Sequence, residues 1–101
     1  MSNRIKLPKD LVRELAYGDD VDGWMFVQRE VIDTWRHGNI YELVIQAPPG
    51  RNYHSALYAY TFREQQNGEW SEFDDEGGEI ELYRVKPVVK TVIHYVPARE
   101  G

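Results

Sequence analysis

The sequence contains no cysteine, and this absence removes several kinds of site at once. Disulfide bridges, thiolate nucleophiles and cysteine-ligated zinc are excluded, and the composition fits a reducing compartment. No apolar run approaches the ~18–20 residues of a membrane-spanning helix, and the N-terminal residues lack the apolar core of a signal peptide. We therefore expect a cytoplasmic protein that makes no membrane contact.

Basic residues are missing from one segment of the chain. No Lys or Arg lies between Glu69 and Glu81, where seven of the 17 acids are found. The remaining ten acids face 12 Lys and Arg, so the formal net charge of −5 is a local property of this segment. Because phosphate groups need basic contacts, we expect no direct nucleic-acid binding there.

Spacings typical of catalysis or metal binding are also lacking. The three histidines (His37, His54 and His94) form no His-x-His or His-x3-His pair, and there is no Gly-rich phosphate loop. His54 and Ser55 are adjacent, but neighbours on a strand point to opposite faces and cannot form a nucleophile–base dyad without a local distortion of the backbone. We therefore expect no enzyme, no metal site and no cofactor.

What the chain does contain is material for one sheet-rich domain. Its 101 residues, 42% of them apolar, suffice for a single core, so we treat residues 1–101 as one domain. Aromatic residues make up 13% of the chain, which favours sheet because aromatic side chains suit pleated surfaces. Residues 40–47 predict the central strand: the odd-numbered positions are all apolar, whereas the even-numbered ones include Glu42 and Gln46.

The other elements follow from periodicity and turn residues. Residues 7–18 predict a short helix, with Pro8 at its first position and Gly18 just past its end. Residues 24–35 predict a long strand, which a hairpin turn at Gly38 and Asn39 joins to the central strand. The remaining expected features are a turn at 19–23, a bulge near Val31 and Ile32, strands at 53–63, 80–85 and 88–96, and a bend at Pro87. The fold class is therefore α+β, with one short N-terminal helix packed on a curved antiparallel sheet of four to five strands in a meander.

Two aromatic groups each leave two interpretations open. Tyr58, Tyr60 and Phe62 form a stripe that is either core or a flat binding surface. The long loop at 64–78 either presents an acidic, aromatic-anchored patch to a basic protein surface or folds its aromatic residues back as a lid over the sheet. The residues of the candidate patch are Glu69, Trp70, Glu72, Phe73, Asp74, Asp75 and Glu76.

Several short segments resemble a known group of proteins. They are Trp35-Arg36-His37-Gly38, Tyr41-Glu42-Leu43-Val44, Gly50-Arg51-Asn52-Tyr53, Glu64-Gln65-Gln66, Tyr83-Arg84-Val85-Lys86-Pro87-Val88 and Tyr95-Val96-Pro97. Together they are similar to the small uncharacterised accessory proteins common in phages of actinobacteria, although the long acidic loop departs from that pattern. The resemblance implies an early-expressed phage protein that binds and modulates a host factor in the host cytoplasm, and it transfers no catalytic residue.

Our leading hypothesis is a non-enzymatic protein that binds a basic host surface through the acidic loop. A second hypothesis is a structural or assembly protein that forms a homodimer through an exposed sheet face or edge. A third is a small-ligand-binding or enzymatic domain with a pocket under the curve of the sheet.

Overall fold

A computed structural model of the chain describes residues 3–74, 77–88 and 97–98. In chain order the elements are β1 (Arg4–Pro8), α1 (Lys9–Ala16), β2 (Met25–Trp35), β3 (Gly38–Gln46), β4 (Leu57–Arg63), the 3-10 helix η1 (Ser71–Phe73) and β5 (Glu79–Val85). One short α-helix and a five-stranded antiparallel sheet make up the described part, which confirms the predicted α+β class.

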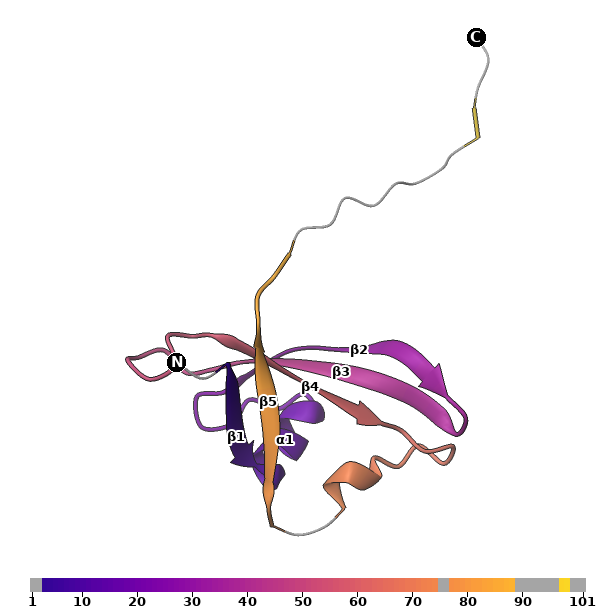
Figure 1. Ribbon diagram of the computed structural model, residues 1–101, viewed down its shortest axis with the longest axis horizontal. Coiled ribbons are helices and arrows are strands. Elements are labelled where there is room, and N and C mark those ends of the chain that lie inside the picture. The colour runs from indigo at the N-terminus through magenta and orange to yellow at the C-terminus, as the bar shows by residue number, and fades with distance from the viewer. Residues whose placement is uncertain (1–2, 75–76, 89–96, 99–101) are drawn as a thin grey trace.

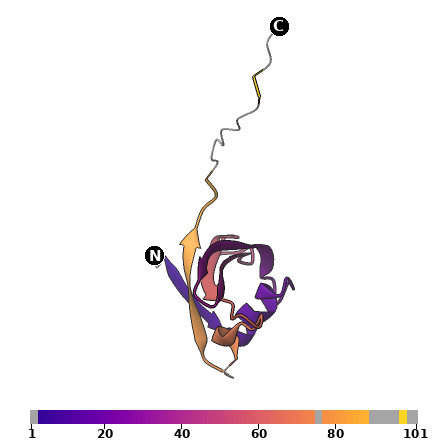
Figure 2. The same cartoon turned by 90° about the vertical axis from the view of Figure 1, so that its right-hand side faces the viewer.

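The strands are ordered β1-β5-β4-β3-β2, and every neighbouring pair is antiparallel. Strands β2, β3 and β4 form the predicted meander, and β1 lies beside β5 (Figure 1). The register of β4 with β5 covers only Leu57 to Ala59, so the two parts of the sheet are joined over a short length. Seen end-on, the strands and α1 surround a common interior rather than lying in one plane (Figure 2).

The core lies on the face of the sheet that α1 covers. Leu43 and Ile45 of β3 are buried there, as the alternation of the central strand predicts. Phe62 of β4 and Leu15 of α1 join them in the same apolar cluster. Tyr58 and Phe62 are buried and Tyr60 packs against the cluster, so the aromatic stripe is core, in agreement with the first of its two interpretations.

The helix is confirmed, but it is not the first element. Leu7 and Pro8 belong to β1, where they pair with Ile80 and Glu79 of β5. Pro8 has φ −54° and ψ 137°, an extended conformation that places it just before the helix rather than at its first position. At the other end, the amide of Gly18 donates to the Leu15 carbonyl with φ +100°, which is the predicted glycine stop.

The register of β2 shifts between Val31 and Asp33, so the predicted bulge is confirmed. A second shift at Val27 was not predicted. The hairpin turn lies two residues earlier than expected: Trp35 pairs with Gly38, so Arg36 and His37 form the turn and Gly38 already belongs to β3.

The segment before β4 also corrects a prediction. Strand β4 begins at Leu57 instead of residue 53, because His54 and Ser55 adopt left-handed φ values of 51° and 57° that no strand accommodates. Strand β5 agrees with the predicted strand at 80–85. Of the strand predicted at 88–96, residues 89–96 lie outside the described part of the chain.

Candidate functional site

The two aromatic residues of the acidic loop point into the protein. Phe73 is only 2% exposed, and Trp70 packs against the core cluster. Their ring centres lie 5.2 and 4.9 Å from that of Phe62. Both rings therefore fold back against the sheet, as the lid interpretation expects, and Phe73 is too deeply buried to be an exposed anchor for a partner.

Glu64 connects this lid to the hairpin between β2 and β3. Its Oε2 accepts a hydrogen bond from Trp70 Nε1 at 2.9 Å, and its Oε1 accepts one from Asn39 Nδ2 at 3.2 Å. Its backbone carbonyl accepts a third from Trp35 Nε1 at 3.0 Å. Sequence reasoning did not single out Glu64, because nothing in its spacing shows that two tryptophan N–H groups converge on it.

The hydrogen bonds to the Glu64 carboxylate affect its titration. The bond from Trp70 is the largest cause that lowers the pKa of Glu64 below its ordinary value of 4.5, with smaller contributions from Asn39, Tyr41 and the Arg29 charge; partial burial opposes them. A carboxyl group whose pKa is lower in the folded state stabilises the fold above its unfolded pKa, and this contribution disappears as the pH falls through the folded pKa.

We predict that Glu64→Gln reduces the pH dependence of stability on the acid side. At about pH 7 the variant should be less stable than the wild type, and the difference should shrink as the pH falls below 4.5 and through the lowered pKa of Glu64, where the wild-type carboxyl group becomes protonated as well. Urea titrations of both proteins across this range give the difference directly, and exposed Glu14→Gln serves as the matched control. A difference that stays constant with pH would contradict the proposed role of the carboxylate.

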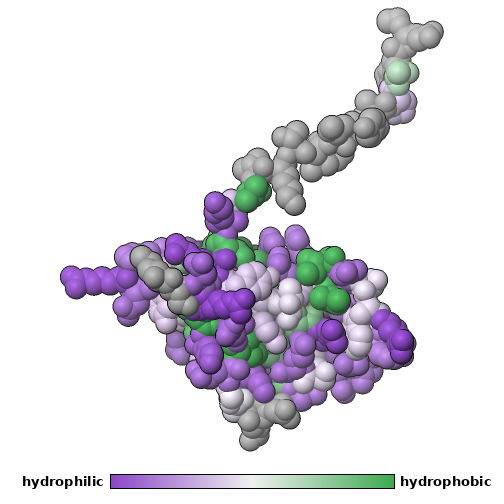
Figure 3. Space-filling model, in the orientation of Figure 1, coloured by the Kyte–Doolittle hydropathy of each residue, from purple (hydrophilic) through white to green (hydrophobic). Residues whose placement is uncertain are grey.

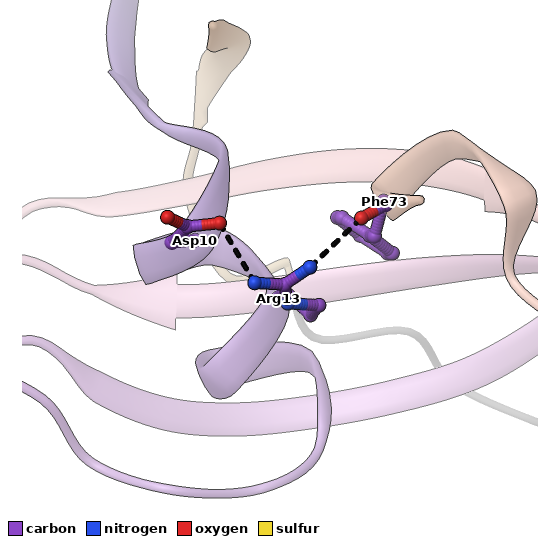
Figure 4. A network of polar contacts seen from close by, with 3 residues as sticks. All are labelled: Asp10, Arg13 and Phe73. Carbon is purple, nitrogen blue, oxygen red and sulfur yellow. Dashed lines mark hydrogen bonds and ion pairs between the residues drawn. The ribbon is translucent and has the colours of Figure 1, made fainter. Parts of the chain in front are cut away.

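Arg13 of α1 ties the end of the lid to the helix (Figure 4). One guanidinium nitrogen donates to the Phe73 carbonyl at 3.0 Å, and another contacts Asp10 Oδ1 at 2.7 Å. On the opposite side of the loop, Glu72 Oε2 accepts a hydrogen bond from the Arg63 amide at 3.0 Å. Residues 64–74 are therefore attached to both α1 and β4, and the Glu72 carboxylate is occupied by the protein itself.

An open hollow of about 520 Å³ lies between α1 and this loop. The Tyr17 ring, 63% exposed, stacks on Trp70 there with ring centres 5.1 Å apart and planes 18° from parallel. Glu69 and Asp74 line the same hollow and are both exposed. We call this feature the Tyr17 hollow; its full lining is Arg13, Tyr17, Gly68, Glu69, Trp70, Phe73 and Asp74.

The structure divides the predicted patch into parts with different roles. Glu69 and Asp74 present their side chains to solvent at the Tyr17 hollow, whereas the remaining described members either pack inward or bond to the backbone. Asp75 and Glu76 lie outside the described residues. Tyr17, which no sequence pattern marked as more than the end of a helix, supplies the exposed aromatic surface in place of Phe73.

The described histidines have ordinary structural positions. His37 packs edge-on against Trp35 in the hairpin turn, and His54 donates its backbone amide to Gly50; His94 falls outside the described residues. Within the described ranges, no three His, Asp or Glu side chains are grouped so that they would hold a metal ion. The same part of the chain contains no helix with the length and apolar character needed to cross a membrane. Comparison of the chain with protein-family models, curated proteins and solved structures gives no match.

Proposed function

We propose that this protein is a non-enzymatic binding domain whose Tyr17 hollow receives a basic side chain of a partner protein. The observation that carries this proposal is the exposed Tyr17 ring, stacked on Trp70 and flanked by the carboxylates of Glu69 and Asp74. A guanidinium or ammonium group is attracted both to an aromatic face and to a carboxylate. The hollow offers the two kinds of group together.

The attachment of the loop supports the proposal. Arg13 holds the Phe73 carbonyl, Glu64 holds the Trp70 indole, and Glu72 holds the end of β4. The exposed carboxylates are therefore carried on a segment that is already ordered, and a partner need not supply the free energy of ordering it. Exposed charges of this kind contribute mainly to association rate and partner choice.

The sequence resemblance to accessory proteins of actinobacterial phages suggests where the partner comes from. On this proposal the protein acts in the host cytoplasm, and its partner is a host protein with a basic surface. Partner capture would then modulate that host protein without any chemical step. The acidic segment between Glu69 and Glu81, free of Lys and Arg, disfavours a nucleic-acid partner at this site.

The test is a charge reversal at the hollow. A fluorescein-labelled peptide of alternating Arg and Gly residues should bind the wild-type chain, and the double variant Glu69→Lys, Asp74→Lys should bind it at least about tenfold more weakly. The melting temperature should stay close to that of the wild type, because both side chains are exposed. Tyr17→Ala should weaken binding as well, through loss of the aromatic face.

The matched control is Asp33→Lys, which changes the net charge by the same amount per site on a different strand, β2. It should retain the wild-type affinity once the ionic strength is near physiological, where distant charges are screened. Equal affinities of the wild type and the double variant would contradict the proposed site. An affinity that falls equally in the control would show attraction by net charge alone.

A further inference from the structure

A second candidate surface lies on the face of the sheet that α1 does not cover. Residues of β3 alternate between the two faces, so Leu43 and Ile45 enter the core while Glu42 and Val44 point to the other side. We call this side the outer sheet face. An open hollow of about 560 Å³ lies on it, with an apolar lining contributed by Val27, Val44, Leu57, Val85 and Val88.

Part of this apolar lining is accessible to solvent. Val27 is 44% exposed and Val88 is 67% exposed, whereas Val44, which also lines the hollow, is only 8% exposed. Figure 3 shows apolar surface over β2 and again near the end of β5, each bordered by polar surface. Exposed apolar side chains grouped beside a buried one are expected of a surface that a further apolar group can cover.

Two carboxylates oppose each other at the same place. Glu30 of β2 and Glu42 of β3 are register partners, and both line the hollow. Like charges directly opposite each other across two strands are destabilising. Among the described residues neither carboxylate forms an ion pair, and Lys86, which also lines the hollow, brings one positive charge against two negative ones.

The Tyr83 side chain contacts one of these two carboxylates. Its hydroxyl donates to Glu42 Oε2 at 3.2 Å. Partial burial, followed by the charge of Glu42 and the hydrogen bond to it, raises the pKa of Tyr83 above its ordinary value. The neutral phenol leaves the negative charge of Glu42 in place, so the charge at the hollow remains available to an incoming cation.

The backbone of β2 can also form hydrogen bonds with a docked segment. It is the end strand of the sheet, so within the described residues its outer edge has no strand partner. Its two register shifts, at Val27 and next to Val31, bracket a regular stretch that contains Glu30. An extended segment can form backbone hydrogen bonds with such an edge while its alternate side chains reach across the adjoining face.

We propose that the outer sheet face docks an extended segment of a partner protein in which one Lys or Arg lies between apolar β-forming residues. The basic side chain is placed between Glu30 and Glu42, whose opposed charges select a cation over a neutral or acidic residue. The residues two positions to either side fall on the same face of the segment, and the one toward the Met25 end of β2 covers Val27 and Val44, which both lie on that side of the Glu30–Glu42 pair. This surface is separate from the Tyr17 hollow and shares none of its residues.

The experiment uses the full chain and two labelled peptides, Val-Thr-Val-Thr-Lys-Thr-Val-Thr-Val, in which the residues two positions from Lys are apolar, and the same sequence with Glu in place of Lys. Fluorescence anisotropy should show binding of the Lys peptide, and at least about tenfold weaker binding of the Glu peptide. Glu30→Lys and Glu42→Lys should each reverse this preference. Glu30→Lys is the cleaner variant, because Glu42 also accepts the Tyr83 hydrogen bond.

The remaining outcomes separate this proposal from its alternatives. The double variant Glu69→Lys, Asp74→Lys should bind the Lys peptide as the wild type does; a parallel loss would place binding at the Tyr17 hollow and overturn the inference. Equal binding of the two peptides, or no reversal in the charge-reversed variants, would also overturn it. The chain's own sequence Val-Val-Lys-Thr-Val-Ile at 88–93 matches the described chemistry. If Lys90→Glu raises the affinity for the Lys peptide, the natural occupant is this segment and not a partner.

Discussion

Replacing Phe62 with alanine is expected to lower the free energy of unfolding by about 4 kcal/mol. The side chain is 1% exposed, and its ring centre lies 5.5 Å from that of Tyr41, 4.9 Å from Trp70 and 5.2 Å from Phe73. Removing it leaves a cavity between the sheet and the lid, which the surrounding rings can fill only in part. Because small domains are stable by only about 5–15 kcal/mol, this change is a large part of the total.

The measurement is urea unfolding followed by circular dichroism and by tryptophan fluorescence. In the variant, the folded baseline of the fluorescence should shift toward the emission of exposed tryptophan, since Trp70 loses a direct neighbour. Thr61→Ala, a change at the adjacent exposed position of β4, is the control and should cost well under about 1 kcal/mol. A loss below about 1 kcal/mol for Phe62→Ala would mean that the lid does not pack on β4 as described.

The same substitution links the core to the proposed binding site. Trp70 contacts Phe62 on the inside and stacks with Tyr17 at the hollow. The Arg29 guanidinium lies 5.0 Å from the centre of the same indole ring and donates to the Ala16 carbonyl at the end of the helix. Loosening Trp70 should therefore weaken binding of the arginine peptide even though Phe62 does not line the hollow.

Local periodicity explains which elements could be predicted from the sequence. In β3 the odd-numbered residues from Tyr41 onward are apolar and share one face of the strand. Of these, Leu43 and Ile45 are buried as expected. The helix was predictable from the helical spacing of the apolar residues Leu11, Val12 and Leu15 and from Gly18, which ends it. Each of these signals is carried by residues within a few positions of one another.

The errors arose where the structure depends on distant partners or on an unusual backbone conformation. Strand β1 forms because its residues pair with β5, as Leu7 does with Ile80. Its five residues alone give an alternation of apolar and polar positions that is too short to predict a strand. The first residues of the strand predicted at 53–63 do not form a strand, because two successive non-glycine residues, His54 and Ser55, adopt left-handed φ values. The secondary-structure propensities of the residues predict neither the pairing of β1 with β5 nor the left-handed conformations of His54 and Ser55.

The candidate site was predictable in its charge but not in its geometry. The absence of Lys and Arg around Glu69 and Asp74 is visible in the sequence. The direction in which Trp70 points is not, because an indole can serve equally as a lid or as an exposed anchor. Its orientation is set by the Glu64 carboxylate and the Phe62 ring, and only the fold brings these together.

Gly38→Ala is expected to lower the free energy of unfolding by about 3 kcal/mol, through steric overlap and not through backbone conformation. A Cβ atom at this position would overlap the carbonyl oxygen of Glu64, and because that atom is backbone it cannot rotate away. The start of β3 would have to move away from Glu64, whose carbonyl oxygen also accepts the hydrogen bond from Trp35 Nε1. Near-UV circular dichroism should therefore change as well.

Gly18→Ala is the matched control. Gly18 has φ +100° but open space around it, so this substitution should cost only about 1 kcal/mol. If Gly38→Ala proves no more destabilising than Gly18→Ala in urea titrations, the close approach of Glu64 to the start of β3 is wrong, and with it the position of the residue that holds the lid.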